Sequence, residues 1–437
     1  MATWADFLLP GLEKRGWQAI LGLVSGPRYH RPAQYLEAHP YHRVVSIHCN
    51  SGTRYGRVKA VRAALRNVRP DVLLTANIPD AIIATAAERN SGNSRSRIVM
   101  SCHGIQRDLF EDMRCLRNEL DHVVCTNKLA CRLAESVGGI EPERVHHAPC
   151  GTVVPDELPA RVVNNQFTIA FAGRLEQDQK RVFDLVEIGA ALRSRNMNFR
   201  ILIAGSGPDE DALKVQLKNS GLSDYFQFLG FVEPSALNRE LYEVADALLL
   251  TSSWETGPIV LWEAMAAGLP IVTSRYLGSV SESILSHRSN CLMFDIGDCD
   301  TGARHLESLM VDRELVRSIR SRAFSDVSAS LTTDISVAQW ERSLSKALDV
   351  APISTASGDC SALAQQAGRL DRWFGPSLAE MVRNIRVPTL DSGPGGEWPH
   401  TLGGQGISDE DFWRRAERLD RIGDKPGLGL SSGASVL

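Results

Sequence analysis

The sequence predicts an α/β protein with parallel sheets, arranged as two successive domains and a tail of different composition. From about residue 40 to residue 350, short apolar segments alternate with longer amphipathic ones, which is the pattern of strands joined by crossover helices. The chain has 437 residues, more than one hydrophobic core usually holds. After residue 350 the alternation gives way to segments rich in Gly, Pro and Ser.

The elements follow in order from a helix at 4–15 and a strand at 17–25. Further elements of the first half are expected as strands at 43–48, 71–76 and 97–101, with helices near 56–67 and 81–89. The second half repeats this rhythm, with strands at 167–172, 199–204, 225–229, 245–251 and 270–274 and helices near 181–193 and 210–219.

Each half is predicted to be one Rossmann-type domain, the first spanning 1–155 and the second 156–350. The boundary is placed in 151–160, a stretch rich in Pro, Val and Asp. Open parallel sheets bind ligands at the carboxyl ends of their strands, so the two domains are expected to face each other across a cleft.

The third region, 351–437, is predicted to be partly disordered. Its Pro-, Gly- and Ser-rich segments at 352–358, at 391–396 and at the end of the chain have the composition of linkers. Two short helices are expected between them. One lies near 361–384 and is interrupted at Gly375-Pro376, and the other starts at Ser408, with acidic residues in its first turn.

The amino-acid composition favours a globular cytoplasmic protein. The balance of 43% hydrophobic and 23% charged residues, with a net charge of -4, is typical of a globular protein, and no nucleic-acid partner is predicted. Nine scattered cysteines lack the spacing of a zinc site and favour a reducing cytoplasm. No stretch resembles a membrane span or a signal peptide, so the predicted location is cytoplasmic, with peripheral attachment to the inner face of the membrane left open.

Glu255 and Glu263 bracket the predicted start of a helix. Pro258 is tolerated at a first helical position, and Gly268 followed by Pro270 ends the helix. The N–H groups of Ile259 and Val260 would then be available to a phosphate. Carboxylates on either side suit the hydroxyls of a sugar and of a ribose, so the pattern favours a sugar joined to a nucleotide through a diphosphate. The alternative is a helix with one solvated and one capping Glu.

Two other predicted strands end in glycine turns. Gly173-Arg174 follows one of them, with Lys180 further along, and two such cations are able to clamp a diphosphate. The alternative is a charged surface loop. Gly205-Ser206-Gly207 follows the other strand, but the third glycine of a dinucleotide fingerprint is replaced by Glu210, so an NAD-dependent enzyme is a distant alternative.

Together these segments resemble the carboxyl-terminal domain of the family-4 retaining glycosyltransferases, which have the GT-B fold. The resemblance covers most of residues 40–350. It rests on Gly173-Arg174 with Lys180, on 204–208 and 228–232, and above all on the stretch from Glu255 to Glu263 followed by 264–270.

The resemblance implies a role for each matching residue. Arg174 and Lys180 would bind the donor diphosphate, Glu255 the hydroxyls of the transferred sugar, and Glu263 the nucleotide ribose. The other residues of the implied donor site are Gly173, Gly205, Thr256, Gly257, Pro258, Ile259 and Val260. Many family members have Gly in place of Pro258, so one backbone donor is lost here.

The family uses UDP, GDP or ADP sugars, retains anomeric configuration and usually needs no bound metal or other cofactor. The charge of the leaving group would then be met by Arg174, Lys180 and the helix start. Losing either cation is expected to cost ~2–4 kcal/mol of transition-state stabilisation.

In the first half, the His-Gly turn at 103–104 resembles a family turn whose His lies near the donor sugar, which makes His103 a candidate catalytic residue. A hydrogen-bonded structural His is the alternative. Family members also begin with a strand and a glycine loop, and neither is visible ahead of the helix at 4–15. A missing first strand, or a start internal to a longer protein, is therefore expected.

Residues 54–69 form a predicted basic helix without an acidic residue. Such a helix is able to lie on an anionic membrane surface and bring a lipid-linked acceptor within reach. The alternative, which we favour, is a solvated helix packed on the sheet through its apolar stripe.

The sequence therefore predicts a retaining hexosyltransferase that moves a sugar from a nucleotide sugar to a glycan, lipid-linked or small-molecule acceptor in surface polysaccharide or glycoconjugate synthesis. The alternative is a non-catalytic GT-B scaffold that binds a nucleotide sugar or a partner enzyme.

Overall fold

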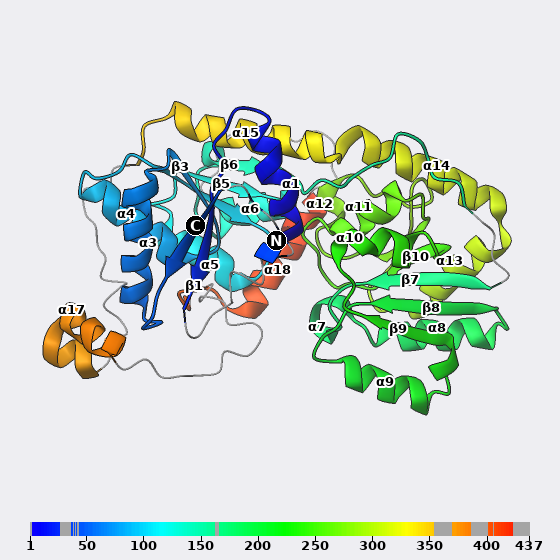
Figure 1. Ribbon diagram of the computed structural model, residues 1–437. Coiled ribbons are helices and arrows are strands. Elements are labelled where there is room, and N and C mark those ends of the chain that lie inside the picture. Colours follow the sequence, from blue (N-terminus) through cyan, green and yellow to red (C-terminus); the bar gives the residue numbers. More distant parts are fainter. Residues whose placement is uncertain are drawn as a thin grey trace, which may run out of the picture. The chain divides into compact units, whose positions relative to one another are not determined.

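The computed structural model describes residues 2–26, 36, 37, 39, 41, 43–161, 166–353, 369–385, 401–404 and 406–422 (Figure 1). The chain divides into two compact units. Unit 1 contains Met1–Thr126, Ala130–Cys150 and Thr333–Ser408, and unit 2 contains Asn127–Leu129, Gly151–Thr332 and Asp409–Leu437. This division differs from the three consecutive domains predicted, because the chain returns to unit 1 at Thr333 and to unit 2 at Asp409.

The strands of unit 1 form two parallel sheets. One sheet pairs β1 (Leu21–Ser25) with β2 (Val44–His48). The other has the order β3 (Val72–Ala76), β4 (Arg97–Cys102), β5 (His122–Cys125) and β6 (Val145–His147).

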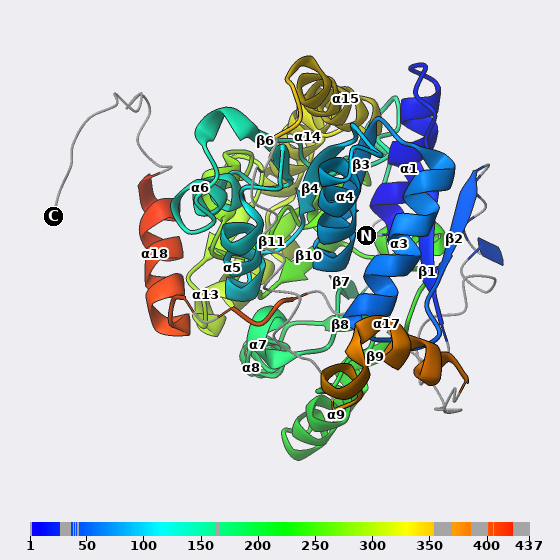
Figure 2. The ribbon, with the colours of Figure 1, turned by 90° about the vertical axis from the view of Figure 1, so that its left-hand side faces the viewer.

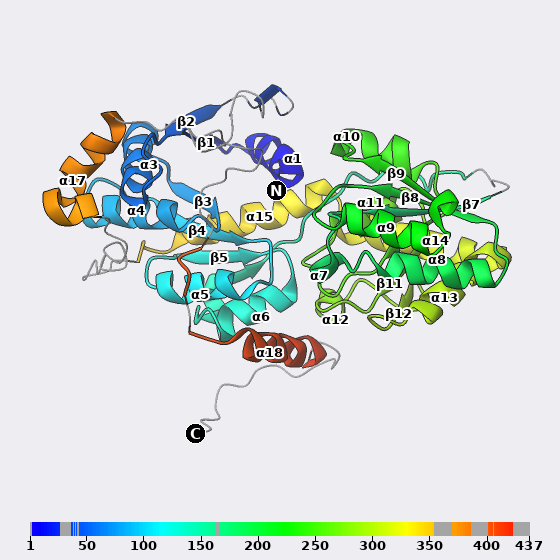
Figure 3. The ribbon, with the colours of Figure 1, turned by 90° about the horizontal axis from the view of Figure 1, so that it is seen from below.

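Helices cover both faces of the four-stranded sheet. Helix α15 (Thr333–Asp349) packs on β3, β4 and β5, and Figure 3 shows α5 (Arg107–Leu116) and α6 (Lys128–Ser136) on the opposite face. Helix α1 (Ala2–Glu13) packs on α15, and α3 (Arg54–Val68) packs on α4 (Pro79–Asn90).

Helix α17 (Arg369–Ile385) lies at the amino-terminal end of α3 (Figure 2). The buried carboxylate of Glu380 accepts hydrogen bonds from Ser51 and, at 2.8 Å, from Thr53, the N-cap of α3. The backbone of α17 leaves the helical region at Gly375 (φ 73°), as the sequence predicts. The linker-like run at 391–396, most of the one at 352–358, and the Gly/Ser end of the chain lie outside the described residues.

Unit 2 is built on one parallel sheet, drawn mainly in green in Figure 1. Its strand order is β12 (Leu292–Phe294), β11 (Ile271–Ser274), β10 (Ala247–Leu250), β7 (Phe167–Ala172), β8 (Phe199–Ala204) and β9 (Phe226–Gly230). Alternate strand residues point to opposite faces, so that Ile169 and Phe171 belong to one hydrophobic core and Ala170 and Ala172 to the other.

Each face of this sheet carries its own helices. The core that contains Ile169 also holds apolar residues of α8 (Asp184–Ser194), α9 (Glu210–Asn219) and α13 (Cys299–Val311). The other core holds residues of α11 (Ile259–Ala266) and α14 (Arg313–Ser330). Short helices α7 (Gln177–Lys180), α10 (Pro234–Leu237) and α12 (Ser279–Glu282) lie in the connections, and α18 (Asp409–Ile422) packs on α12.

The predicted fold class is confirmed, because both units are α/β with parallel sheets. The bounds of β7, β8 and α9 coincide with the predicted ones. Each of these elements has a clear period in its apolar residues and is flanked by turn residues, which is where sequence patterns are most informative.

Candidate functional site

In unit 2, the loops that follow β7 and β8 meet at the carboxyl ends of these neighbouring strands. The Gly173 N–H donates to Ala204 at 3.0 Å, and the Gly205 N–H donates to Gly230 at 2.7 Å. Gly205 has φ 140°, and a Cβ atom built on it would lie 1.9 Å from the Gly173 carbonyl oxygen. Only glycine fits this approach, so the two loops form a tight backbone wall at the end of the sheet.

Lys180 and Glu255 are brought together at this edge. Lys180 ends α7 and Glu255 lies in the loop between β10 and α11, and the Lys180 Nζ is 2.6 Å from the Glu255 Oε1. Both side chains are largely buried, with 13% and 6% of their surfaces exposed. The Ser252 hydroxyl donates to Glu255 at 2.5 Å and the Gln179 amide at 3.3 Å. The carboxyl group is thus oriented and held beside a cation.

Arg174 is the exposed cation of the same region. Its side chain is 66% exposed, and its Nε lies 3.3 Å from the carboxylate of Glu176. A surface ion pair of this kind contributes about 1 kcal/mol or less, so a multiply charged ligand is able to draw the guanidinium away from Glu176.

Helix α11 begins one residue later than predicted. Pro258 is its N-cap (φ -67°, ψ 101°) and Ile259 its first residue. The Leu261 N–H donates to the Pro258 carbonyl at 2.9 Å, and within the described residues no hydrogen bond is recorded for the N–H groups of Ile259 and Val260. These two groups carry the positive end of the helix dipole and are therefore able to bind an anion.

Glu263 lies on the second turn of α11. It accepts a hydrogen bond from the Tyr242 hydroxyl at 2.8 Å. Burial raises the pKa of Glu263 to about 7, and the bond from Tyr242 opposes this shift. A carboxyl group with such a pKa is able both to accept and to donate hydrogen bonds near neutral pH, which suits a vicinal diol.

Glu282 is a buried carboxyl group that the sequence analysis missed. It accepts hydrogen bonds from the Gly257 N–H at 2.8 Å, from the Tyr276 hydroxyl at 2.9 Å and from the Asn127 amide at 2.6 Å. Burial raises its pKa to about 8. Glu282 therefore holds the Glu255-Thr256-Gly257 loop in place through the Gly257 N–H. No local pattern around Glu282 indicates this role, because its partners come from distant segments.

The loop ahead of Glu282 is held by α18. The Asp420 carboxylate accepts hydrogen bonds from the Gly278 N–H at 2.8 Å, from the Ser281 N–H at 2.9 Å and from the Ser281 hydroxyl at 2.6 Å. Asp420 is buried. The predicted second helix of the tail is thus an integral part of unit 2.

The predicted donor-site residues and Glu255 lie in unit 2, whereas His103 lies in unit 1. His103 follows β4 and is buried against two aromatic side chains, with ring centroids 4.7 Å from Trp4 and 6.2 Å from Trp340. Burial lowers its pKa to about 3, so the imidazole is neutral at physiological pH.

Burial of neutral His103 predicts acid sensitivity. His103 binds a proton near pH 6.5 in the unfolded chain and near pH 3 in the folded chain. The contribution of neutral His103 to the free energy of unfolding is therefore fully present above pH 6.5 and decreases as the pH is lowered from 6.5 to 3. Between pH 6.5 and 5 the loss is about 2 kcal/mol. His103→Phe keeps a ring between the Trp side chains and removes the titration. Urea unfolding at pH 7.5 and 5 should show a smaller pH effect in the variant, and an equal effect would contradict the assignment.

The basic helix predicted at 54–69 is α3, and much of its charge is neutralised within unit 1. Arg57 forms an ion pair with Asp80, and Arg62 and Arg66 lie 2.5 and 2.9 Å from the carboxylate of Glu88. Both acids belong to α4, which packs on α3. The helix therefore presents less positive charge than its sequence suggests.

Among the described residues, no group of three or more His, Cys, Asp and Glu side chains is placed to hold a metal ion. None of the described helices combines the length and the apolar character required to cross a membrane.

Comparison with known proteins finds similarity in the part of the chain that carries this site. Residues 158–326 match the model of glycosyl transferases group 1. N-acetyl-alpha-D-glucosaminyl L-malate synthase from Bacillus anthracis is 31% identical over 37% of this chain and 41% of its own length. Alpha-monoglucosyldiacylglycerol synthase from Acholeplasma laidlawii is 29% identical over 38% of this chain and 40% of its own length. The chain thus spans less than half of these relatives.

The fold has close counterparts among solved structures. Anabaena Alr3699/HepE, in complex with UDP and glucose, superposes with a TM-score of 0.64 and 18% identity over 79% of this chain and 95% of that protein. The domain match covers β7 to α14, the elements that carry Lys180, Glu255 and Glu263. Residues 158–326 thus resemble glycosyl transferases group 1, and the chain has the GT-B fold.

Proposed function

We propose that the protein transfers a sugar from a nucleoside-diphosphate sugar to a glycan, lipid-linked or small-molecule acceptor, with retention of anomeric configuration and without a bound metal ion. The observation that carries the proposal is the buried Lys180–Glu255 ion pair beside the start of α11. It puts a cation, a sugar-binding carboxylate and backbone N–H donors at the carboxyl end of one parallel sheet, where such sheets bind ligands.

The diphosphate is assigned to Lys180, Arg174 and the N–H groups of Ile259 and Val260. Lys180 is fixed by Glu255, whereas Arg174 is exposed and able to close over the ligand. Together they oppose the negative charge that grows on the departing nucleotide, which is the role that a metal ion would otherwise fill. The backbone wall of Gly173 and Gly205 lets the ligand approach closely.

The sugar and the ribose are assigned to the two glutamates. Glu255 is held beside Lys180 and accepts hydrogen bonds from hydroxyl groups of the transferred sugar. Glu263 holds the ribose diol, and Tyr242 orients its carboxyl group. Thr256, Gly257 and Pro258 shape the turn between the two glutamates, and Glu282 anchors this turn through the Gly257 N–H.

Thermal-shift measurements with UDP, GDP and ADP test the donor class. A nucleotide that binds the folded state raises the melting temperature in proportion to the logarithm of its concentration relative to its Kd. One of the three is expected to stabilise the protein more than the others. Failure of all three to do so would contradict the proposal. Transfer in the presence of EDTA tests metal independence, and the anomeric configuration of the product tests retention.

Arg174→Ala is expected to lower kcat/KM for sugar transfer about thirtyfold, a loss of ~2 kcal/mol at the lower end of the range for a charge-stabilising donor. The modest size follows from the exposure of the side chain, which water screens. Arg239→Ala is a matched control, because Arg239 is another exposed unit 2 arginine paired with a neighbouring acid, Glu240. Equal kinetics of Arg174→Ala and the parent would remove Arg174 from the site.

We also propose a lipid-linked acceptor and a cytoplasmic location. The name of the Acholeplasma relative identifies a glycolipid synthase, which supports a lipid-linked acceptor. The cysteines at the described positions are free thiols, as expected in the cytoplasm. We do not propose a membrane contact for residues 54–69, because Asp80 and Glu88 pair with basic side chains of α3.

The burial of His103 favours a second candidate, a protein that binds nucleotide sugar without turning it over. The imidazole packs against the Trp4 ring, with centroids 4.7 Å apart, and its pKa is lowered to about 3, so it carries no positive charge near neutral pH. Incubation with a panel of UDP, GDP and ADP sugars separates the two candidates. If a nucleotide sugar binds but no acceptor leads to release of free nucleotide, the protein is a non-catalytic binding protein. Release of free nucleotide identifies it as an enzyme.

A further inference from the structure

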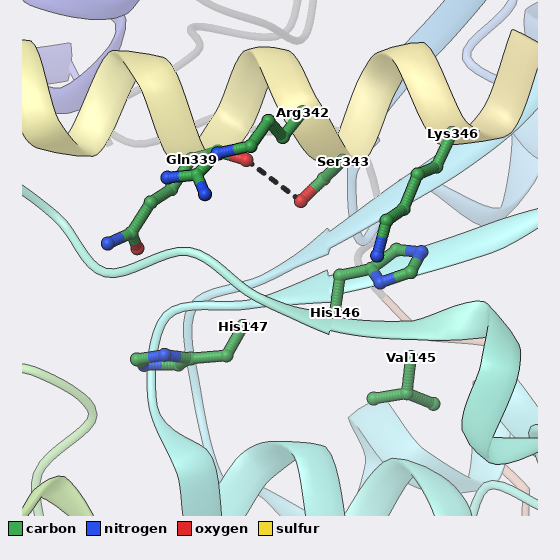
Figure 4. Close-up of a pocket in the computed structure, with 7 residues that line it drawn as sticks. All are labelled: Val145, His146, His147, Gln339, Arg342, Ser343 and Lys346. Carbon is green, nitrogen blue, oxygen red and sulfur yellow. Dashed lines mark hydrogen bonds between the residues drawn. The ribbon is translucent and has the colours of Figure 1, made fainter.

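A pocket lies within unit 1 between the last strand of the sheet and α15. It has a volume of about 390 Å³ and is lined by side chains of β6 and of one face of α15, namely Val145, His146, His147, Gln339, Arg342, Ser343 and Lys346 (Figure 4). The α15 residues are spaced three and four positions apart, so they share one side of the helix. The lining residues belong to unit 1 and differ from the unit 2 residues discussed above.

The lining is strongly cationic. Arg342 and Lys346 are permanently charged at neutral pH, and His146 and His147 add imidazole nitrogens. Figure 4 shows the Lys346 side chain reaching the His146 ring and the Arg342 guanidinium lying near the Gln339 amide. Among these described lining residues, none carries a carboxylate. Like charges four residues apart on a helix repel each other, so an anion between them would be stabilising.

His146 is held in place by a second histidine. Its Nε2 lies 2.7 Å from the Nδ1 of His122, and the two rings stack with centroids 4.8 Å apart. Burial, followed by the charges of His122 and Lys346, lowers the pKa of His146 to about 4. The His146 ring is therefore neutral near pH 7, and its contact with His122 orients it before any ligand arrives.

We propose that this β6–α15 pocket binds the phosphate group of a phosphorylated ligand. The planar guanidinium of Arg342 and the ammonium of Lys346 are the side-chain groups best suited to phosphate oxygens. The pocket is larger than a single phosphate requires, so the ligand carries a second phosphate or an organic group. The Val145 side chain provides an apolar contact for such a group.

Titration calorimetry with inorganic phosphate and with pyrophosphate, at constant ionic strength, tests the site. The full chain carrying Lys180→Met serves as the parent, so that unit 2 competes less for the anion. Arg342→Ala and Lys346→Ala are each expected to weaken binding about tenfold, and the double variant about a hundredfold. The conservative variants Arg342→Lys and Lys346→Arg keep the charge and should bind within about fivefold of the parent.

Lys59→Ala is the matched control, because Lys59 is an exposed cation on α3 of the same unit and does not line the pocket. It should bind like the parent. Unchanged affinity in the double variant, or an equal loss in Lys59→Ala, would overturn the proposal. Circular dichroism of each variant confirms the fold, and the conservative variants remain informative if an alanine variant unfolds.

Vesicle flotation separates the two sources of the phosphate group. Vesicles of phosphatidylcholine with and without phosphatidic acid are compared in the presence and absence of pyrophosphate. Flotation that needs phosphatidic acid, is displaced by pyrophosphate and is lost in the double variant identifies a lipid headgroup. Calorimetric binding without flotation identifies a soluble phosphorylated ligand. Absence of binding in both experiments contradicts the proposal. Neither result depends on sugar transfer, so the site and the proposed activity are tested separately.

Discussion

Lys180→Met is expected to lower kcat for sugar transfer by about a hundredfold to a thousandfold, the loss measured when one donor to a developing negative charge is removed. Lys180 is the largely buried cation of the proposed donor site, and its ammonium group lies 2.6 Å from Glu255. A charge held at low exposure acts through a lower effective dielectric than an exposed one, so its loss should exceed that of Arg174. Steady-state kinetics with saturating donor measures the effect.

The Lys180 variant also allows the coupling between Lys180 and Glu255 to be measured. Methionine leaves Glu255 with hydrogen bonds from Ser252 and Gln179 but without its cation. The double variant Lys180→Met/Glu255→Gln removes both charges, and a double-mutant cycle gives the coupling between the two residues. If both residues act on the same bound donor, the double variant is expected to lose less activity than the product of the single losses.

Lys214→Met is the matched control for this experiment. Lys214 belongs to the same unit and also forms an ion pair, at 2.6 Å to Glu210, but this pair is exposed on α9. Its removal should leave kcat unchanged and have little effect on stability, because water screens an exposed ion pair. Activity of Lys180→Met within threefold of the Lys214→Met control would show that Lys180 does not stabilise the leaving group.

The sequence predicted the parts of the site that depend on local patterns. The glycine turns after β7 and β8 and the segment from Glu255 to Glu263 follow strands with clear apolar periods, and parallel strands end at a common edge. The sequence did not predict the direct contact between Lys180 and Glu255, which lie 75 positions apart. The start of α11 was displaced by one residue because Pro258 is able to serve either as N-cap or as first residue.

Features that depend on partners from distant segments were not predictable. Glu282 anchors the site loop only because Asn127 and Gly257 arrive beside it in the fold. The acidic partners of α3 belong to the next helix, so a reading of residues 54–69 alone overstated their charge. The β6–α15 pocket likewise combines His146 with Arg342, which lie almost 200 positions apart in the sequence. Long-range pairing of this kind has no local signature in one sequence.

Gly205→Ala is expected to lower the free energy of unfolding by about 3 kcal/mol or more, because two costs add at this position. The backbone has φ 140°, which L side chains rarely adopt, and the new Cβ atom would meet the Gly173 carbonyl oxygen at 1.9 Å. The contact is with backbone, so no side-chain rotation relieves it. The loops after β7 and β8 must therefore separate. Urea unfolding at 25 °C measures the loss, and nucleotide binding should weaken with it.

Gly230→Ala separates these two costs. Gly230 lies in the same unit and has φ 69°, but a Cβ atom there would meet nothing within 4 Å. Its replacement should therefore cost only the conformational strain, about 1–2 kcal/mol. The difference between the two variants isolates the clash with Gly173. Equal losses would mean that the loops relax freely, and the rigid backbone wall assigned to the donor site would then be wrong.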